Sequence, residues 1–592
     1  MDDQNKNLIL ATALSFIVIL VWFVLFPPPE PVEPAPTEVT ATDGTTLGVD
    51  ADTTAQVGEP ALLAPQAPED VIANAPRVTI DSESLIGSLS LTGGRIDDLS
   101  LKGYRETLDA DADLVRLLSP IGTDHPYYAL HGWVAAVGAT ADQVPNSATE
   151  WQVESGETLS PGNDVTLLWD NDAGLIFRKS FAVDEDFLFT VTQSVENTTG
   201  ADIALRPYGL VARHGEPDQI GFFIQHEGVV RMSDGSMEEI NYDDMPDLTT
   251  DEGRVEVEEN GWIGFSDQYW MTALIPSPGR DFRSTAKFGN DIYQIETVYP
   301  MITVAAGASA TADTQFFAGA QEWEVIRSYQ NDLGIDRFLD SIDWGWFFFL
   351  TKPIFAVLHW LNGLIGNMGW SIIALTFIIK ALLLPLAYKS YVSMAKMREL
   401  QPEMAKLKEA AGDDREKLQK GMMALYKDNK VNPASGCLPI LMQIPIFFSL
   451  YKVIFVTIEL RHAPWVGWIN DLSAPDSSSL FNLFGLLPWD APAPESILSL
   501  IFIGVMPIVL GISMWLQQKL NPAPTDPTQK MIFAWMPWVF MFMLGGFASG
   551  LVLYWIANNT ITFMQQYAIM RSQGFKPDLF GNITGRSKTD PE

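Results

Sequence analysis

A charged residue inside a membrane-length apolar stretch constrains this chain more than any other feature. Residues 369–389 read GWSIIALTFIIKALLLPLAYK, and a helix of about 20 residues crosses the ~30 Å hydrocarbon core of a bilayer. Lys380 lies near the middle, where a charge costs roughly 2.5–3.5 kcal/mol on insertion scales. The lysine either reaches the membrane surface or lines a cavity together with Thr376, which lies one turn earlier. We favour the cavity, because Lys380 is far from both ends.

Charge divides the 592 residues into two blocks. Residues 27–345 contain 16 Lys and Arg against 55 Asp and Glu, whereas the rest of the chain is nearly neutral and strongly apolar. The length predicts at least two domains. The acidic block would repel phosphates, so we expect no DNA partner. Cys437 is the only cysteine, which excludes disulfides and cysteine-based metal sites.

The N-terminal region predicts a membrane anchor followed by a linker. Residues 8–26 are 19 residues without a charge. A signal peptide is the alternative, but the segment is long, rich in bulky side chains and has no A-x-A-like cleavage site. We therefore interpret residues 1–26 as a transmembrane anchor. Residues 27–76 are rich in Pro, Ala, Thr and acidic residues, which is typical of a flexible linker.

Alternating β-rich runs dominate residues 77–340. Examples are RVTID at 77–81 and FLFTVT at 187–192, and clusters such as DNDAG at 170–174 separate such runs. This pattern predicts an all-β sandwich domain. No catalytic, nucleotide-binding or metal-binding motif occurs, so we expect neither an enzyme nor a cofactor. Four histidines without ligand spacing are interpreted as surface or packing residues: His125, His131, His214 and His226.

The remaining chain predicts a multi-pass α-helical membrane protein. Residues 344–366 carry three tryptophans, Lys352 and Pro353. We place them as an interfacial amphipathic helix, with Lys352 as an anchor; a transmembrane helix is the alternative. Together with the N-terminal transmembrane anchor, five further segments give six predicted spans. The segments are spans at 369–389, 436–458, 497–518, 531–546 and 549–570, a polar helical hairpin at 390–433, a loop at 459–496 and a tail at 571–592.

Basic residues orient the spans. Residues 390–433 contain nine Lys and Arg, whereas residues 461–495 contain one. By the positive-inside rule the hairpin and both termini are cytoplasmic. The β domain then lies in the periplasm of a two-membrane bacterium. This arrangement requires five spans after residue 366 and speaks against a sixth at 344–366.

Four motifs in order resemble the YidC/Oxa/Albino family of membrane protein insertases in its Gram-negative form. They are TFIIKALLLPL, YVSMAKMRELQP, KVNPASGCLPILMQIPIF and SGLVLYWIANN. The resemblance implies a five-helix insertase core with a groove open to cytoplasm and lipid. It also implies a periplasmic β-supersandwich similar to sugar mutarotases, and work both alone and beside the Sec translocon. The groove's basic residue, often arginine in the family, is Lys380 here, which lacks the planar fork of arginine.

The resemblance and the residue types together give a candidate substrate groove. Its members are Lys380, Thr376, Gln443, Tyr554, Trp555, Asn558 and Asn559. Lys380 would attract acidic residues of a translocated segment, while the amides and hydroxyls would offer neutral hydrogen bonds. The alternative for Gln443, Asn558 and Asn559 is a structural role in holding helices together.

The hairpin is the second candidate site. Its methionines suit contact with varied apolar chains and its cations suit ribosomal RNA, although an ordinary two-helix coil is equally compatible. We expect docking of the ribosome and nascent chain at Lys396, Arg398, Met404, Lys408, Asp413 and Asp414, with Asp413 or Asp414 capping the second helix.

The predicted function is insertion and folding of inner-membrane proteins. The expected partners are nascent membrane proteins, the ribosome, the Sec translocon with its accessory subunits, and the lipid bilayer. Two other classes remain as alternatives: a secondary transporter or channel that uses Lys380 as its site, and a membrane-anchored periplasmic enzyme acting on sugars. The first lacks repeated halves, and the second needs only one anchoring helix.

Overall fold

The computed structural model describes most of the chain after the predicted linker. The described residues are 65–217, 219, 225–412, 414–429, 438–484, 486–489, 492, 496, 498, 501–521 and 527–574. The predicted anchor at 1–26, linker residues 27–64, Asp413 and tail residues 575–592 therefore lie outside the described residues.

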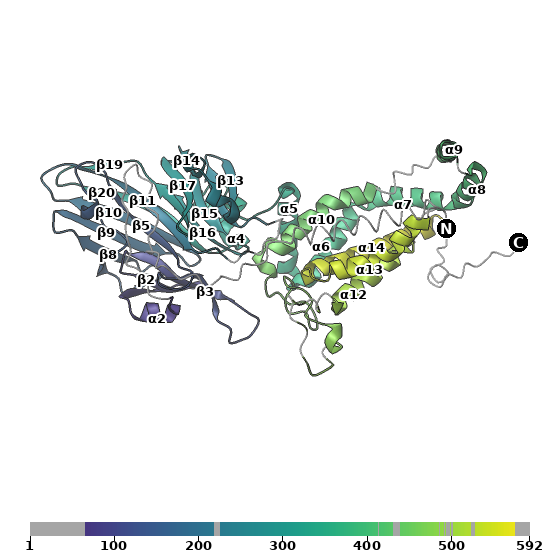
Figure 1. Cartoon of the computed structure of the whole chain (residues 1–592), viewed down its shortest axis with the longest axis horizontal. Helices are drawn as coiled ribbons and strands as arrows, with labels where there is room; N and C mark the ends of the chain where they lie inside the picture. The colour runs from purple at the N-terminus through teal and green to yellow at the C-terminus, as the bar shows by residue number, and fades with distance from the viewer. Residues whose placement is uncertain are drawn as a thin grey trace.

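A large antiparallel sheet forms one layer of the β domain (Figure 1). Its one parallel pairing among the described strands joins β1 and β7. The strand order is β14 (Arg254–Val257), β17 (Phe282–Gly289), β18 (Ile292–Val298), β11 (Ile203–His214), β5 (Tyr127–Ala135), β3 (Arg95–Arg105), β2 (Leu85–Ser90), β1 (Arg77–Asp81) and β7 (Thr158–Leu159), with β19 (Ile302–Val304) beside β11 and β4 (Leu114–Leu118) beside β3.

A second antiparallel sheet forms the other layer. Its order is β13 (Ser236–Asn241), β12 (Gly228–Ser233), β15 (Gly261–Ser266), β16 (Trp270–Pro276), β20 (Ser309–Ala320), β10 (Leu188–Asn197), β9 (Leu175–Val183), β8 (Val165–Asp170) and β6 (Gln152–Ser155). Short helices α2 (Pro68–Ala73) and α3 (Thr250–Gly253) and the 3-10 helices η1 (Ala141–Gln143) and η2 (Tyr242–Asp247) lie between strands.

Alternation in the sequence explains how the two sheets pack. Along β9 every second side chain is buried, as expected for a strand with one face on a core. Phe177 and Phe181 of β9 and Phe316 of β20 are completely buried in that core. A hydrogen bond of 2.7 Å between the hydroxyls of Tyr127 and Thr272 joins the two sheets across it. The domain is thus the predicted all-β sandwich.

The rest of the described chain is mainly helical, apart from the loop between α10 (Leu438–Val456) and α12 (Val505–Gln518). The other helices are α4 (Trp323–Asp332), α5 (Phe348–Ile365), α6 (Met368–Leu382), α7 (Leu384–Glu399), α8 (Gln401–Ala411), α9 (Arg415–Asp428), α13 (Pro527–Met543) and α14 (Ser549–Ser572), with the 3-10 helices η3 (Phe338–Ser341), η5 (Ile458–Leu460) and η6 (Leu480–Asn482).

The helix predicted to be continuous over 369–389 is broken. Helix α6 ends at Leu382, α7 begins at Leu384, and the two are bent by 67°. Pro385 lies in the first turn of α7. It has no N–H to donate to the carbonyl of Ala381, and its ring would clash with that carbonyl in a straight helix. The predicted hairpin boundary at residue 390 consequently falls inside α7.

Helix α12 begins at Val505, inside the span predicted at 497–518, and the described residues 498 and 501 before it are also helical. Two loop side chains accept the first free amides of the helix: Ser478 Oγ from Val505 N at 2.9 Å and Asp476 Oδ2 from Met506 N at 2.7 Å. These acceptors cap the helix at that point. Residues 531–546, predicted as one span, overlap α13, which runs from Pro527 to Met543.

Helix lengths alone identify few complete membrane spans. Within the described part of the chain, α5 alone is long and apolar enough to cross a bilayer, and the bent pair α6–α7 would be a second if counted as one span. The apolar parts of α10 and α12 are shorter. The predicted count of six is therefore not established by these helices, and α5 is the segment we expected at the membrane surface.

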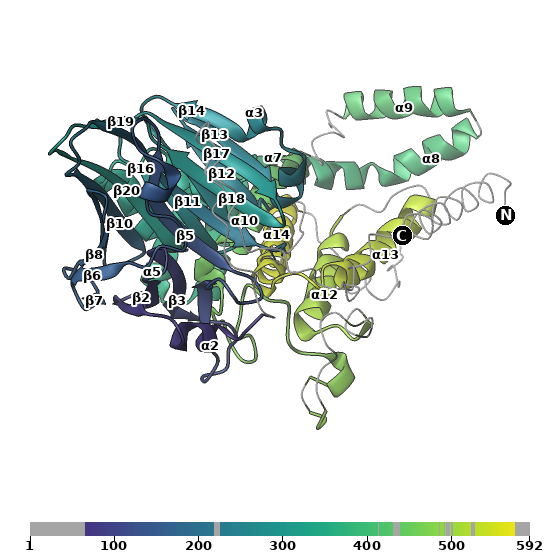
Figure 2. The same cartoon turned by 60° about the vertical axis from the view of Figure 1, so that its left-hand side comes forward.

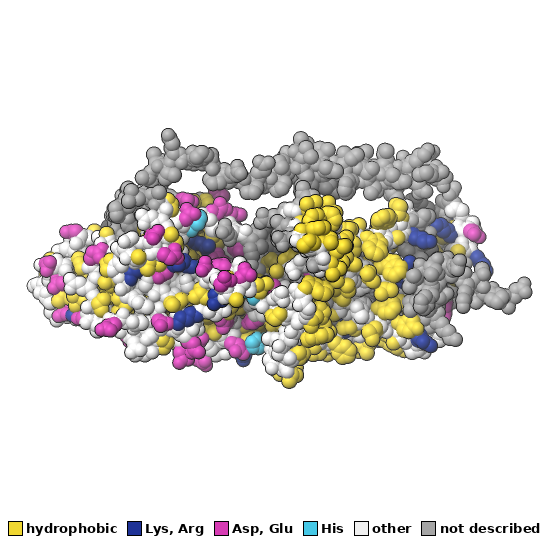
Figure 3. All heavy atoms as spheres, turned by 90° about the horizontal axis from the view of Figure 1, so that it is seen from below, with side chains coloured by type: hydrophobic (Ala, Val, Ile, Leu, Met, Phe, Trp, Pro, Cys, Tyr) yellow, Lys and Arg dark blue, Asp and Glu magenta, His cyan; other side chains and the backbone are white. Residues whose placement is uncertain are grey.

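The β domain occupies one end of an elongated molecule and the α8–α9 hairpin projects from the other (Figures 1 and 2). Between them, hydrophobic side chains form a belt over the face of the helical part that Figure 3 shows. Exposed members of this belt include Phe377, Leu382, Leu441, Ile532, Trp535 and Met564. Acidic side chains crowd the β-domain side of the belt, and basic ones gather on the opposite side (Figure 3).

Candidate functional site

Helix α14 is the element around which the candidate groove is built. It packs against α6, α10 and α12 and carries a buried face of polar residues within an otherwise apolar bundle. These residues are Asn558, Asn559, Thr562 and Gln566. One pair is adjacent and the other spacings are three or four residues, which keeps all four on one side of the helix.

A continuous chain of hydrogen bonds starts at Lys380. The Lys380 ammonium donates to Gln443 Oε1 at 3.3 Å, and Gln443 Nε2 donates to Asn558 Oδ1 at 2.8 Å. Asn558 Nδ2 lies 3.4 Å from Asn559 Oδ1. These bonds connect α6, α10 and α14 through side chains alone, and they unite four of the seven residues predicted for the groove.

The same chain continues into α12. Asn559 Nδ2 donates to Ser513 Oγ at 3.1 Å, and the Ser513 hydroxyl donates to the Leu510 carbonyl at 2.7 Å. Every donor in the series therefore points away from Lys380, so that each amide presents its oxygen toward the lysine. This alignment of dipoles stabilises a cation at the start of the chain.

Lys380 itself is half-buried and has an amide as its partner. Among the described residues no carboxylate forms an ion pair with it. A charge of this kind in an apolar environment is costly unless it faces water or a partner. The Lys380 carbonyl also accepts Gln565 Nε2 at 3.3 Å, which ties the same turn of α6 to α14.

Three predicted groove residues have other surroundings. The Thr376 hydroxyl is buried and donates to the Ile372 carbonyl of its own helix at 2.7 Å. Tyr554 is only 2% exposed and is hydrogen-bonded to Gln443, so it supports the chain from inside. Trp555 is half-buried and its ring stacks on Phe447, with ring centroids 5.2 Å apart. Thr376 is thus not joined to Lys380 by a hydrogen bond.

Sequence reasoning missed part of the polar chain. Ser513, Gln565 and Gln566 belong to it or flank it, and Gln566 Nε2 donates to Asn521 Oδ1 at 3.1 Å. The two glutamines follow Asn558 and Asn559 by seven residues, which is two helical turns, so periodicity along α14 was an available signal. Ser513 had no such signal in its own helix.

The hairpin has its own small apolar core. Met404 is buried there and packs with Leu400, Met397, Met422, Leu425 and Tyr426. Asp414 Oδ1 accepts Lys417 N at 3.0 Å and so caps α9, as predicted for one of the two aspartates. Lys396 and Lys408 lie on α7 and α8. Asp413 and the side chain of Arg398 lie outside the described residues. Met404 therefore stabilises the hairpin instead of offering an exposed contact.

The described residues contain no group of three or more His, Cys, Asp or Glu side chains able to hold a metal ion. Two of the four histidines named from the sequence are packing residues: His131 and His226 are buried in the β domain. The chemistry that the groove offers is binding by hydrogen bonds and charge, and the described residues assemble no nucleophile or acid–base pair around Lys380.

Comparison with protein families matches both parts of the chain. Residues 77–357 match the family described as YidC periplasmic domain, and residues 360–576 match the family described as 60Kd inner membrane protein. The boundary between the two matches falls within α5.

Full-length relatives carry a single name. The membrane protein insertase YidC of Roseobacter denitrificans is 64% identical, and the alignment covers 100% of each chain. The membrane protein insertase YidC of Dinoroseobacter shibae is 65% identical over 99% of each. These names describe neither a transporter nor an enzyme, the two alternative functions considered from the sequence.

One solved structure, titled as an active YidC insertase with its first transmembrane domain resolved, covers 84% of this chain. The match covers 96% of that structure's own chain, at 18% identity and a TM-score of 0.34.

Proposed function

The chain belongs to the YidC family of membrane protein insertases, and from this premise we propose that the polar chain beginning at Lys380 is the groove through which it works. The activity is insertion of newly made membrane proteins into the inner membrane, a non-enzymatic role. The observation that carries the proposal is a half-buried cation in the apolar helix α6 whose described partner is a neutral amide.

The groove would lower the cost of moving a hydrophilic segment into apolar lipid. Lys380 attracts carboxylates of the incoming segment, because Coulomb attraction is strong where water is scarce. The half-buried Gln443 amide exchanges hydrogen bonds with the passing polypeptide, and the buried Asn558 and Asn559 amides hold Gln443 and the lysine in place when the groove is empty. Transfer of the substrate's own apolar helix into lipid, at roughly 25 cal/mol per Å² buried, drives the process.

Short helices support a thin membrane at the groove. Helix α12 has 14 residues and α13 has 17, so at 1.5 Å per residue they reach only about 21 and 25 Å. A bilayer of ordinary thickness must thin around such helices. Thinning reduces the distance that a polar segment has to cross.

We propose six membrane-spanning segments with both termini in the cytoplasm and the β domain in the periplasm. Support comes from the basic side chains on one side of the belt and the acidic side chains on the other (Figure 3). Helix α5 lies at the junction of the β domain and the helical part (Figure 1), which favours a position along the membrane surface.

A cysteine at position 236 should react with an impermeant reagent from the periplasm, and one at position 410 only after the inner membrane is opened. Reaction of both from outside would refute the topology.

The hairpin is proposed to meet the ribosome and the nascent chain. Cations such as Lys396 and Lys408 suit the phosphates of ribosomal RNA, and exposed Met423 offers an adaptable apolar contact. Cooperation with the Sec translocon and its accessory subunits is expected from the family.

Shortening the hairpin by residues 405–427 should impair insertion while the helical part still folds. Failure of the shortened protein to accumulate would instead assign the hairpin a structural role.

Site-specific photocrosslinking tests the groove directly. A photoreactive residue at position 443 should form an adduct with a ribosome-held nascent membrane protein. A matched control is position 535 on α13, where Trp535 is 65% exposed but is not part of the polar chain. Equal adduct formation at both positions would show that the substrate contacts the helical surface at large, and the groove proposal would be wrong.

A further inference from the structure

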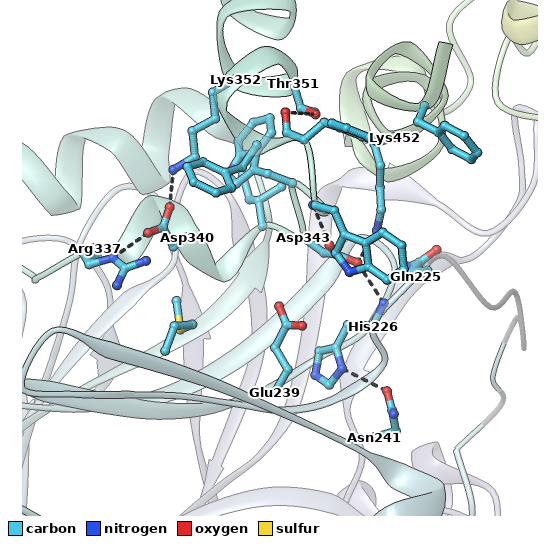
Figure 4. A pocket seen from close by; sticks show the side chains of 18 residues that line it. Gln225, His226, Glu239, Asn241, Arg337, Asp340, Asp343, Thr351, Lys352 and Lys452 are labelled. Carbon is cyan, nitrogen blue, oxygen red and sulfur yellow. Dashed lines mark hydrogen bonds and ion pairs between the residues drawn. The ribbon is translucent and has the colours of Figure 1, made fainter. Parts of the chain in front are cut away.

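A cavity lies where the β domain meets the helical part, away from the groove. Its volume is about 870 Å³, and its walls come from β13, the segment after η3, the start of α5 and helix α10 (Figure 4). Three cationic and three anionic side chains line it: Arg337, Lys352, Lys452, Glu239, Asp340 and Asp343. The cavity is balanced in total charge, but the two signs are not evenly distributed.

One corner of the cavity carries an excess positive charge. Arg337 Nε donates to Asp340 Oδ2 at 2.7 Å, and the Lys352 ammonium forms an ion pair with Asp340 Oδ1. Two cations thus share one carboxylate, which leaves a net charge of +1. The start of α5 also borders the cavity through Phe347 and Phe348, and the N-terminal end of a helix dipole adds partial positive charge.

The opposite corner holds two carboxylates, one of which is already paired with a cation. Asp343 forms an ion pair with Lys452 of α10 and accepts the backbone N–H of His226 at 2.9 Å. Glu239 of β13 points into the cavity beside them (Figure 4). Among the described residues, no hydrogen bond or ion pair occupies the Glu239 carboxylate. At this corner Asp343 is thus paired with a cation, whereas Glu239 has no cationic partner among the described residues.

The surroundings of Glu239 leave its carboxylate partly uncompensated. Partial burial raises the pKa of Glu239, the nearby Asp343 carboxylate raises it further, and His226 and Lys452 oppose that rise. A ligand cation placed here would restore the ordinary ionisation of the carboxylate. The His226 ring is already engaged, with Nδ1 at 3.1 Å from Asn241 Oδ1 and Nε2 at 3.0 Å from the Val229 carbonyl.

The apolar part of the lining connects the cavity to the hydrophobic belt. Trp346 is 93% exposed and Phe348 and Phe448 are also exposed, and all three border the cavity. Aromatic side chains at the boundary between apolar and polar surroundings are typical of the membrane interface. A ligand that enters from this side can keep an apolar tail against the aromatic rings while its polar end reaches the charged corners.

We propose that this cavity binds the headgroup of a zwitterionic phospholipid of the ethanolamine type. The phosphate lies at the corner formed by Arg337 and Lys352, the ammonium donates to Glu239, and the acyl chains run along Phe348 and Phe448 into the bilayer. Opposite charges a few atoms apart in the headgroup match the two corners. A lipid so held would join the β domain to the membrane leaflet beneath it.

Native mass spectrometry of the full chain tests the assignment. The delipidated protein in detergent is titrated with dioleoyl phosphatidylethanolamine, phosphatidylglycerol or phosphatidylcholine. We expect one tightly retained phosphatidylethanolamine, and weaker retention of phosphatidylglycerol, which has no cation. Phosphatidylcholine should also be weaker, because its quaternary nitrogen has no N–H to donate to Glu239. Soluble phosphoethanolamine should compete poorly, since it lacks the chains; competition as strong as that of the lipid would assign the cavity to a free metabolite and overturn the lipid proposal.

Two substitutions test the two corners of the cavity separately. Glu239→Gln should weaken phosphatidylethanolamine by about tenfold, the value of a charge-assisted hydrogen bond, and leave phosphatidylglycerol unchanged. Lys352→Met should weaken both lipids, since both carry a phosphate. The matched control is Glu258→Gln, an exposed glutamate of the same domain that is not among the cavity residues. Equal retention of phosphatidylethanolamine by Glu239→Gln and Glu258→Gln would refute the proposal.

Discussion

The β domain and the helical part bury polar side chains in different ways. In the β domain, most buried charges have partners of opposite sign, such as Arg77 with Asp97 and Lys287 with Glu296, whereas buried Lys179 donates to the Gly93 carbonyl at 2.8 Å. In the helical part, the polar chain consists of neutral amides and a hydroxyl, and the cation at its end has an amide as its partner. A paired charge is already satisfied and fixes a structure. A cation that meets only amide oxygens can still attract a carboxylate from outside.

The largest effect should come from removing core volume in the β domain. Trp262 is 1% exposed, packs edge-on against Phe338 and donates to the Asp336 carbonyl at 3.0 Å. Trp262→Ala should lower the free energy of unfolding of this domain by about 3–5 kcal/mol, with insertion of substrates retained. Val137→Ala, at a position 66% exposed in the same domain, is the control. Denaturation of the full chain together with an insertion assay measures both. Loss of insertion with the helical part intact would show that insertion depends on the β domain, contrary to this prediction.

A somewhat smaller effect is expected at the contact between the regions. Lys452 of α10 is almost fully buried beside Asp343, which also accepts Gly345 N at 3.0 Å. Asp343→Asn leaves the ammonium without a carboxylate, which should destabilise the junction by about 3 kcal/mol. The double variant Asp343→Asn/Lys452→Met should recover most of this loss. Native-state proteolysis at the junction gives the double-mutant cycle, and additive losses would show that the two residues do not act as a pair.

Acidification should affect the β domain and the junction in opposite directions. Burial lowers the pKa of His131 from 6.5 to about 3 and that of His214 from 6.5 to about 4. The unfolded chain therefore binds more protons below pH 6.5, and the β domain loses stability as pH falls from about 6.5 toward 4. Burial raises the pKa of Glu459, at the junction, from 4.5 to about 7. Its contribution is present at low pH and is lost as pH rises through about 7.

Melting of the β domain followed by tryptophan fluorescence between pH 4.5 and 7.5 checks the first half of this prediction, and His131→Gln should flatten the dependence. Native-state proteolysis near residue 459 checks the second half, with Glu459→Gln as the matched variant. If both regions change with the same sign, the assignment of these groups is wrong.

The smallest effect on stability is expected within the polar chain. Asn558→Leu keeps the size of the side chain but removes the acceptor of Gln443. Interhelical hydrogen bonds in membranes contribute about 0.6 kcal/mol on average and seldom more than about 1.7, so unfolding should become easier by roughly 1 kcal/mol. Thr560→Val, on the exposed side of α14, is the control. A loss of several kcal/mol in the free energy of unfolding would show that the polar chain serves mainly to hold the helices together.

Periodic patterns in the sequence predicted most of the fold and part of the site. Period-two alternation predicted the sandwich because its strands, such as β9, have one buried face. The break after Leu382 was not predicted, although Pro385 was visible, because proline in a membrane helix is often accommodated by neighbouring groups. The start of α12 depends on the loop acceptors Asp476 and Ser478, which are distant in sequence. Local patterns do not contain such contacts.

Within the site, sequence spacing predicted faces but not hydrogen bonds. Thr376 lies one turn from Lys380 as expected, yet its hydroxyl bonds to its own backbone, a common choice for threonine inside a helix. Lys352, expected as an interface anchor, forms an ion pair with Asp340. The partners of Lys380 come from α10 and α14, and only the packing of three helices brings them together.

The most direct test of the central claim is a charge series at Lys380 with substrates that differ only in the charge of the translocated tail. Lys380→Arg should retain insertion. Lys380→Ala should impair acidic tails more than neutral ones, and Lys380→Glu should be worse still for acidic tails, because two unit charges about 4 Å apart at an effective dielectric constant near 20 repel by about 4 kcal/mol. Equal insertion of acidic and neutral tails by the alanine and glutamate variants would contradict the account, since Lys380 would then attract no substrate charge.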